Sequence, residues 1–394
     1  MGARREKQKK IRVITILISV LLLLLAVASM LFSRHVTEML PSQQAAARWS
    51  PDGDRVAQVT AYIPEHSGLT QAATQSVIRG LRNGLVTEGI DPNDADGGGA
   101  WTYAYSAQGV LQLSSAHRGP ATVYATGVGG NFFLFNPVQL ISGSSFPQDS
   151  INRDLVLLDE TLAWWLFGAS DVAGMTVYIG GVPHVIAGVY RPYEDFASQA
   201  ATGDMPHMFL FYDALEAELG FAPITNVQAV LPNPVSGLAE EFLAEAMEAA
   251  NLEEGEYALV NNTDRYTLGA LIDVIRGFGT RSMRQMGFSL PQWENAARMA
   301  EDFAALTLLL TLLFLIFPTI TALRLIVRCW RRRKWRLFRG IWRRLDHRRE
   351  QKREKAWRMQ SEETEILENE EAQYDLEEII RSVRESEGNH EKEN

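Results

Sequence analysis

Cysteine is nearly absent from this chain: Cys329 is the only one among 394 residues. A single cysteine forms no internal disulfide, so any folded region must be held by a hydrophobic core of its own. Lysine is absent from residues 34–302, where 13 Arg stand against 31 Asp and Glu. This acidic balance argues against nucleic acid as a partner of that region.

The motifs that usually mark an enzyme or a metal centre are missing too. The sequence has no HExxH, no GxSxG and no cysteine-based site, and no two of its seven histidines have metal-ligand spacing. Asp159 and Glu160 are adjacent carboxylates, but an Asp at the start of a helix is sufficiently explained as a cap. We therefore predict a non-enzymatic protein without a bound cofactor or metal.

Two glycine-rich stretches have some features of ligand sites. Gly127-Val128-Gly129-Gly130-Asn131-Phe132 begins like a dinucleotide fingerprint, but its sixth position is Phe and no helix opens convincingly there. The loop 91–99 has oxygen ligands of the kind that calcium uses, yet it lacks the Glu that completes an EF-hand. We interpret the loop as an acidic turn, with calcium binding as the alternative.

Long apolar runs occur at two places. Residues 13–32 and 304–323 are each 20 uncharged and mostly apolar residues, enough to cross a bilayer as a helix. Pro318 lies in the second run and can be tolerated in lipid as a kink. We predict a cell-membrane protein with two transmembrane helices.

The charges that flank these runs predict the topology. Basic residues precede the first run and follow the second: Arg4, Arg5, Lys7, Lys9, Lys10, Arg12, Arg324, Arg328, Arg331, Arg332, Arg333 and Lys334. The positive-inside rule places residues 1–12 and the C-terminal part in the cytoplasm and residues 34–302 outside. A cleaved signal is the alternative, since Ala26-Val27-Ala28 resembles a cleavage site, although apolar residues continue through Phe32.

The outer region alternates strand-like and helix-like segments, which indicates an α+β fold. Residues 55–63 form an apolar strand pattern, and residues 69–88 an amphipathic helix with Val77, Ile78, Leu81 and Leu85 on one face. Further strands are expected at 101–106, 109–113, 208–212 and 226–231, and helices at 213–219 and 235–250. The order predicts a βαββαβ-like skeleton that is interrupted in the middle.

The interruption contains the most regular pattern in the chain. Residues 155–158 are a short strand, Asp159 can cap the next helix, and Gly168 ends it. Leu162, Trp165 and Leu166 share one side of that helix, so we expect Trp165 to be buried as a core anchor. Two β-rich runs, 175–179 and 184–189, are joined by a Gly-Gly-Val-Pro turn at 180–183.

Five segments in this order resemble the extracytoplasmic core domain of MacB-type ABC transporter permeases. The segments are 127–133, 140–143 with Phe146, 155–168, 172–177 and 186–189, and the resemblance is specific over residues 122–192. The residues that carry it as structural motifs are Gly129, Gly130, Phe132, Gly143, Phe146, Asp159, Trp165, Gly168, Gly174 and Gly188.

The resemblance implies a fold and a mode of action. A ferredoxin-like Porter half, about 52–120 plus 207–262, would be interrupted by a Sabre half at about 121–206. Such permeases pass ATP-driven motion from a cytoplasmic ATPase through a stalk and paired membrane helices to the outer domain. The stalk would here be 267–302, and the implied partners are an ABC ATPase, a full permease or a second copy of the chain.

The chain departs from that family in its membrane part. A full permease of this type has four spans, whereas this sequence turns polar after Val327. Two functions from different classes follow. The first is a transport-associated subunit whose outer domain couples to substrate or envelope partners. The alternative is a membrane-tethered recognition, scaffold or sensor protein that uses the outer domain without transport.

The C-terminal part changes charge sign along its length. Residues 324–358 hold 16 Lys and Arg against three acidic residues. With interleaved aromatics they predict a helix lying on an anionic membrane surface. Its binding residues would be Arg331, Arg332, Arg333, Trp335, Arg339, Trp342 and Arg343. A purely topological signal and a nucleic-acid patch are the alternatives. Residues 359–394 are acidic, and we expect them to dock on a partner, to fold back on the basic helix or to form a disordered tail.

Overall fold

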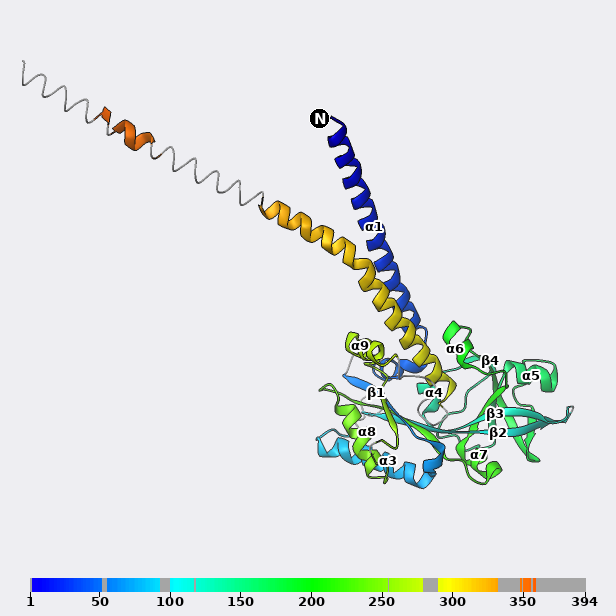
Figure 1. Ribbon diagram of the computed structural model, residues 1–394. Helices are drawn as coiled ribbons and strands as arrows, with labels where there is room; N and C mark the ends of the chain where they lie inside the picture. Colours follow the sequence, from blue (N-terminus) through cyan, green and yellow to red (C-terminus); the bar gives the residue numbers. More distant parts are fainter. Residues whose placement is uncertain are drawn as a thin grey trace, which may run out of the picture. The chain divides into compact units, whose positions relative to one another are not determined.

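A computed structural model describes residues 2–51, 55–92, 100–116, 118–253, 255–278, 290–331, 348, 350–355 and 357–358. The chain divides into two units, residues 1–315 and 316–394. The first unit contains the N-terminal helix and an α+β domain (Figure 1). In the second unit, the described residues are helical.

The helices are interleaved with the strands along the whole first unit. The helices are α1 (Gly2–Glu38), η1 (Pro41–Gln43), α2 (Ala45–Trp49), η2 (Glu65–Ser67), α3 (Gln71–Thr87), α4 (Phe132–Phe135), α5 (Glu160–Phe167), α6 (Phe196–Ala201), α7 (Tyr212–Leu219), α8 (Leu238–Glu248) and α9 (Leu268–Gly277). The strands are β1 (Val56–Tyr62), β2 (Thr102–Ser115), β3 (Ala121–Gly130), β4 (Gln139–Gly143), β5 (Leu155–Asp159), β6 (Thr176–Ile179), β7 (Val182–Arg191), β8 (His207–Phe211), β9 (Ile224–Pro232) and β10 (Ala258–Asn261). A further helix, Gln292–Arg331, follows α9 and is called the second long helix below.

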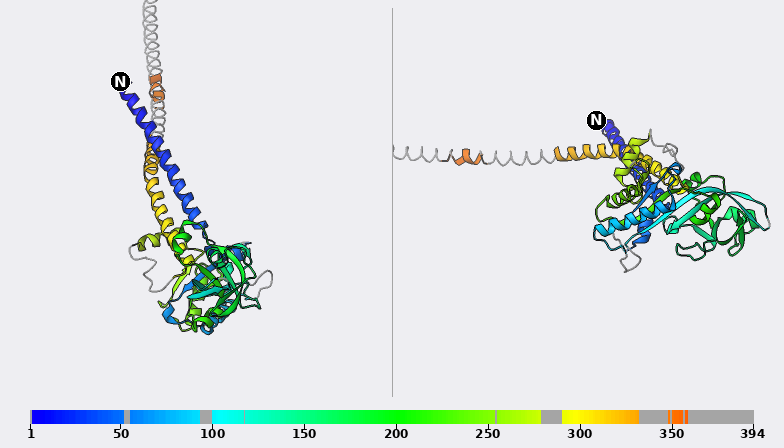
Figure 2. Two further views of the ribbon diagram at one scale, coloured as in Figure 1. Left: turned by 90° about the vertical axis from the view of Figure 1, so that its right-hand side faces the viewer. Right: turned by 90° about the horizontal axis from the view of Figure 1, so that it is seen from below.

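Among the described residues, two helices are long and apolar enough to cross a membrane: Lys10–Glu38 within α1, and the second long helix. α1 lies alongside the first part of the second long helix (Figures 1 and 2), and Ser29 Oγ donates a hydrogen bond to Thr307 O at 3.0 Å. Where α1 ends, Val36 and Leu40 pack against the alanines Ala296, Ala297 and Ala300. Small residues allow this close approach of two helices.

One sheet of ten strands runs through the domain, in the order β10-β1-β9-β2-β3-β8-β5-β7-β4, with β6 beside β2 and β7. The neighbours among β10, β1, β9 and β2 are all antiparallel. In chain order, β1-α3-β2 and β9-α8-β10 form the βαββαβ skeleton expected from the sequence. α3 and α8 cover one face of it (Figure 1), where the four predicted apolar residues of α3 are buried.

The segment between β2 and β9 supplies the rest of the sheet. β8 is parallel to β3 and antiparallel to β5, and β5 is parallel to β7. β6 and β7 form the expected hairpin, but Ile179 pairs with Val182 and Tyr178 with Pro183. The turn is therefore only Gly180-Gly181, shorter than predicted. Both glycines have positive φ, +54° and +87°, as a tight two-residue hairpin requires.

The strands expected at 101–106 and 109–113 are a single strand, β2, so that prediction was wrong. β3 pairs with β2 without a break from Ala104 to Leu113. The only irregularity is a bulge between Ser106 and Ala107, on the side of β9. Gly109, which looked like a break, continues the strand. A Cβ there would lie 2.5 Å from Leu219 Cδ1, so glycine makes room for α7.

The interpretation of Trp165 as a buried core anchor was also wrong. Its side chain is 42% exposed, and the adjacent Trp164 is 53% exposed. The eight-residue helix α5 buries Leu162, Ala163 and Leu166 instead. The small Ala163 thus takes the core position beside the two leucines, and Trp165 lies on the surface with the Arg118 guanidinium 6.0 Å from its ring.

Candidate functional site

β1 has two buried faces of opposite character. Alternate residues point to opposite faces of a strand, so Ala57, Val59 and Ala61 face the apolar core beneath α3 and α8. The other face carries Gln58, Thr60 and Tyr62, which are each 0% exposed. Buried polar groups are costly unless they are hydrogen-bonded. Here Gln58 bonds to the segment after α1, Thr60 to Asn262 after β10, and Tyr62 to Glu294 on the second long helix.

The hydrogen bonds of this polar face lead towards the end of α1. Gln58 Nε2 donates to Ser42 O at 2.8 Å, and Gln58 Oε1 accepts from Ala45 N at 2.8 Å. Thr60 Oγ1 donates to Asn262 Oδ1 at 2.7 Å. Asn262 Nδ2 then donates to Gln43 Oε1 at 2.9 Å. The segment that follows α1 is therefore fixed to β1 by side-chain hydrogen bonds.

A buried group of charged and polar side chains, which we call the neck cluster, joins the same face to the second long helix. It consists of Gln43, Tyr62, Arg265, Glu294, Arg298 and Glu301. Arg265 lies between β10 and α9. Its Nη1 donates to Glu294 Oε2 and its Nη2 to Glu294 Oε1, both at 2.7 Å. Its Nε donates to Glu301, and Nη1 also reaches Gln43 Oε1 at 3.1 Å.

The charges of the neck cluster balance within it. Two guanidinium groups meet two carboxylates, and Arg298 Nε donates to Glu294 Oε1 at 2.9 Å. Tyr62 Oη donates to Glu294 Oε2 at 3.0 Å. Burial alone would lower the pKa of Arg265, but the charge and hydrogen bonds of Glu294 raise it above its usual value. Burial first, and Glu294 second, raise the pKa of Tyr62 well above its usual value, so its proton stays in place.

Several predicted motif residues lie beside this neck. Phe132 is 1% exposed and its ring meets that of Trp293, on the second long helix, with centroids 5.5 Å apart. Phe133 links Phe132 to Phe146, with centroid distances of 5.5 and 5.1 Å. Gly129 lets the Tyr105 ring pack on β3, since a Cβ there would lie 2.1 Å from Tyr105 Cζ. Phe132, Phe133 and Phe146 form one aromatic layer with the start of the second long helix. Gly129 and Tyr105 belong to the core on the opposite face of the sheet.

The other motif residues are separate from that layer. Gly143 and Gly188 are paired residues of the antiparallel neighbours β4 and β7. Gly174 N donates to Ile186 O at 2.7 Å, and Gly168 ends α5 in the left-handed conformation. Asp159 caps α5 as expected, since its Oδ1 accepts from Leu162 N at 2.6 Å. Its Oδ2 also accepts from His207 N at 2.6 Å, a bond to β8 that sequence reasoning missed.

Some predicted features fall outside the residues that the structure describes. Among the proposed membrane-surface residues, Arg331 is described and exposed, while Arg332, Arg333, Trp335, Arg339, Trp342 and Arg343 lie outside. The acidic tail and most of the loop 91–99 lie outside as well. Within the described ranges, no group of three or more His, Cys, Asp or Glu is arranged to hold a metal ion.

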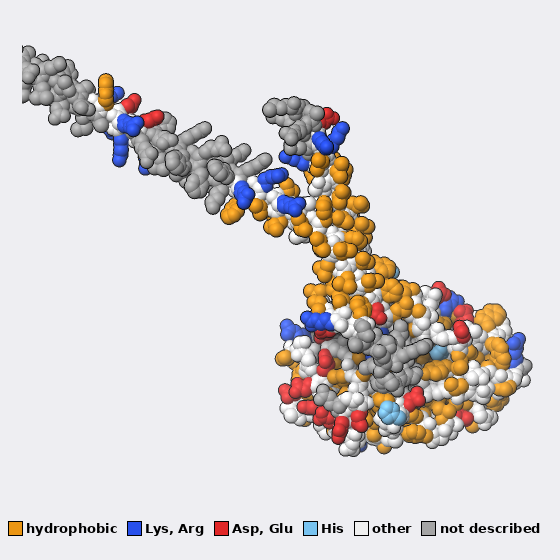
Figure 3. Space-filling view, viewed as in Figure 1, with side chains coloured by type: hydrophobic (Ala, Val, Ile, Leu, Met, Phe, Trp, Pro, Cys, Tyr) orange, Lys and Arg blue, Asp and Glu red, His pale blue; other side chains and the backbone are white. Residues whose placement is uncertain are grey.

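The surface of the first unit separates apolar from acidic regions. Hydrophobic side chains cover α1, whereas acidic side chains gather over the end of the domain that holds α3 and α8 (Figure 3). Glu240 and Glu241 lie in the first turn of α8. The combination is an acidic α+β domain that lies between two helices of membrane-spanning length.

A family comparison assigns this architecture. Residues 13–255 match the family model described as the MacB-like periplasmic core domain. The match covers more than half of the chain, so the chain belongs to this family. It confirms the resemblance that the glycine and aromatic motifs predicted. A search of curated proteins found no match.

Solved structures of three related domains are similar to this chain. The periplasmic region of MacB from Actinobacillus actinomycetemcomitans is 14% identical, and the match covers 59% of this chain and 96% of that one with a TM-score of 0.38. The extracellular domain of the noncanonic ABC-type transporter YknZ from Gram-positive bacteria is 17% identical, and the match covers 52% of this chain and 100% of that one with a TM-score of 0.35. A domain of a putative permease protein from Porphyromonas gingivalis is 17% identical, and the match covers 56% of this chain and 97% of that one with a TM-score of 0.31.

Proposed function

We propose that the chain is a non-enzymatic, transport-associated membrane subunit related to ABC transporter permeases, in which movement of the second long helix reaches the outer domain through the neck cluster. One observation carries this proposal. Arg265 of the domain binds two carboxylates of the second long helix, Glu294 and Glu301, in a fully buried setting.

A buried ion pair suits this role because it is costly to separate. Removing one partner of such a pair leaves an uncompensated buried charge and costs about 3–5 kcal/mol. Thermal motion therefore does not open the cluster often. The start of the second long helix, β1 and the β10–α9 loop should move together, so a tilt of the helix would be passed to the sheet.

The strand order supports a finer description of the outer domain. The Porter half would be β1, α3, β2, β9, α8 and β10, whose order β10-β1-β9-β2 is that of a ferredoxin-like unit. The Sabre half would be the segment inserted between β2 and β9. Its boundaries at about 121 and 206 are proposed from the sequence.

The proposed topology has both ends in the cytoplasm and residues 34–302 outside. The basic residues beyond each apolar run support it. The test uses an impermeant thiol reagent on cells that carry the full chain with Cys329→Ser, combined with either Ser236→Cys or Ser361→Cys. We expect Ser236→Cys to be labelled in intact cells and Ser361→Cys only after permeabilisation. Labelling of both in intact cells contradicts the topology.

The transport role is tested by purification of the tagged full chain from its native host in mild detergent. We expect an ABC ATPase or a four-span permease to co-purify. A matched chain without residues 359–394 checks whether capture depends on the proposed cytoplasmic tail. If neither transporter component is retained while a different envelope protein is, the transport role is wrong and the recognition role replaces it.

The recognition alternative is favoured by a specific surface. Trp164 and Trp165 are adjacent, exposed and far in sequence from the neck cluster. Exposed tryptophans are enriched at protein interfaces. The variant Trp164→Ser with Trp165→Ser should lose an envelope partner and keep its fold, because α5 buries neither ring.

A further inference from the structure

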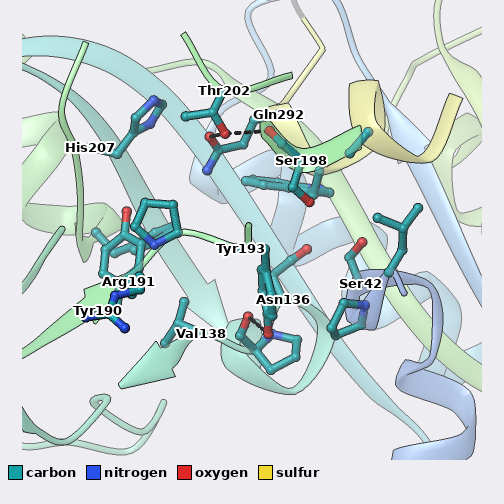
Figure 4. A pocket seen from close by; sticks show the side chains of 17 residues that line it. Ser42, Asn136, Val138, Tyr190, Arg191, Tyr193, Ser198, Thr202, His207 and Gln292 are labelled. Atoms are coloured by element: carbon teal, nitrogen blue, oxygen red, sulfur yellow. Dashed lines mark hydrogen bonds between the residues drawn. The ribbon is translucent and has the colours of Figure 1, made fainter. Parts of the chain in front are cut away.

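A pocket lies beside the neck cluster, and the proposed function does not use it (Figure 4). Its volume is about 80 Å³. Its walls come from four places: Leu40 just after α1, Asn136 and Val138 before β4, Tyr190 on β7, and Trp293 near the start of the second long helix. The pocket therefore touches two segments that also meet at the neck cluster, the one after α1 and the start of the second long helix.

Three polar groups in these walls have no hydrogen-bond partner. They are Tyr190 Oη, Asn136 Oδ1 and Trp293 Nε1, all buried. Tyr190 is 4% exposed and Asn136 is 6% exposed. Buried polar atoms without partners are uncommon and each one destabilises a fold. Three of them around one pocket mark a place where a bound polar group would gain hydrogen bonds, after small side-chain rotations into the pocket.

The chemistry of the walls defines the partner. Trp293 Nε1 only donates, Asn136 Oδ1 only accepts, and Tyr190 Oη does both. The cation nearest to the pocket, Arg191, is already paired with Glu160, Nε to Oε2 at 2.8 Å. Burial lowers the pKa of His207, another wall residue, which favours its neutral form. The pocket thus offers matched donors and acceptors without a free charge.

The position of the pocket adds a second constraint. Leu40 lies just beyond the apolar helix that ends at Glu38, and Trp293 lies near the start of the other apolar helix. Tryptophan is typical of the interface between a membrane and water. Apolar side chains, Val138 and Phe209 among them, complete the walls.

We infer that this pocket binds the polar end of a neutral amphiphile, a hydroxyl and carbonyl group attached to an apolar chain. The hydroxyl would donate to Asn136 Oδ1, and the carbonyl would accept from Trp293 Nε1 and Tyr190 Oη. Because its walls come from the segment after α1, from the second long helix and from the sheet, an occupied pocket would also stabilise the joint between them.

The test uses the full chain in phosphatidylcholine nanodiscs with 15N-labelled tryptophan, in which Trp293→Phe identifies the Trp293 indole signal. One arm adds monooleoylglycerol to the bilayer, and the other adds soluble glycerol monobutyrate, which has the same polar end. We expect a saturable shift of the Trp293 signal and none of the Trp164 and Trp165 signals. A response to monooleoylglycerol alone identifies the bilayer as the source, and a response to both or to the monobutyrate alone identifies binding from solution.

Two variants separate binding from folding. Tyr190→Phe removes an unpaired hydroxyl, so we expect unchanged or higher thermal stability and at least fivefold weaker binding. Val138→Phe should fill the pocket and abolish the shift. Oleate, with a charged end, should not compete. If neither neutral probe shifts the Trp293 signal, the pocket holds water only and the inference is wrong. Equal binding by the wild type and Tyr190→Phe would also overturn the assigned contacts.

Discussion

Arg265 and Glu294 form a bidentate ion pair in which Nη1 donates to Oε2 and Nη2 to Oε1, both at 2.7 Å. The side chain of Arg265 is 3% exposed and that of Glu294 is 0% exposed. Arginine suits this contact because its planar guanidinium group can donate two parallel hydrogen bonds to a carboxylate. The ammonium group of lysine lacks this geometry. The pair joins the α+β domain to a helix of membrane-spanning length.

Replacement of Arg265 by Met should destabilise the chain strongly. The change leaves the carboxylates of Glu294 and Glu301 buried with fewer positive partners, so we expect a loss of about 3–5 kcal/mol in the free energy of unfolding. Denaturant unfolding of the full chain in detergent measures it. Arg276→Met is the matched control, because its ion pair with Asp273 is exposed, and it should cost less than about 1 kcal/mol.

A second variant distinguishes an ionic contact from mere packing. Arg265→Met combined with Glu294→Gln removes both charges of the main pair. We expect the double variant to lose less stability than the sum of the two single variants. If the losses add, the residues stabilise the neck independently, and the pair does not couple the helix to the domain.

Asp159 should be more important than an ordinary helix cap. Its two carboxylate oxygens accept from Leu162 N and His207 N, both at 2.6 Å, so Asp159→Ala leaves two donors without partners. We expect a loss of about 2–4 kcal/mol, from about 1–2 kcal/mol for each bond. Asp195→Ala removes only the cap bond to Ser198 N of α6 and should cost about 1 kcal/mol. Thermal unfolding of both variants decides whether the second bond matters.

The sequence was informative where the pattern is local. The apolar stripe Val77, Ile78, Leu81 and Leu85 predicted both α3 and its buried face, because residues three and four apart share one side of a helix. The cap at Asp159 and the stop at Gly168 are equally local. Trp165 shows the limit of such reasoning. A stripe predicts which residues are neighbours on the helix, but not which of them the sheet covers.

The neck cluster was missed because its partners are distant in sequence. Glu294, Arg298 and Glu301 are spaced at four and three residues, so a charged stripe on one helical face was readable. Nothing local indicates that Arg265 and Gln43 meet that stripe. Gln58 and Thr60 alternate with apolar residues, which is typical of a strand with one solvent face. Only the tertiary structure reveals that Gln58 bonds to the segment after α1 and Thr60 to Asn262 after β10.

Two glycines with the same backbone conformation should respond differently to substitution. Gly143 and Gly168 have φ of +72° and +73°. Either glycine replaced by Ala incurs about 1–2 kcal/mol for the left-handed conformation. A Cβ at Gly143 would also lie 2.2 Å from Ala187 O, whereas one at Gly168 meets nothing within 4 Å. We expect Gly143→Ala to cost about 1–3 kcal/mol more, as measured by denaturant unfolding. Equal losses contradict the close approach of β4 to β7.

Acid should destabilise the α+β domain through two histidines. Burial lowers the pKa of His184 and of His207 below the ordinary value of about 6.5. In the pH window between these lowered values and about 6.5, the unfolded chain binds more protons than the folded one, so stability falls as the pH falls. Thermal unfolding of the full chain at about pH 7 and about pH 5 should give a smaller difference for His184→Leu with His207→Leu than for the wild type. His66→Leu, at an exposed position, is the control and should leave the difference unchanged. An unaltered difference in the double variant means that carboxylates, not these histidines, govern the acid response.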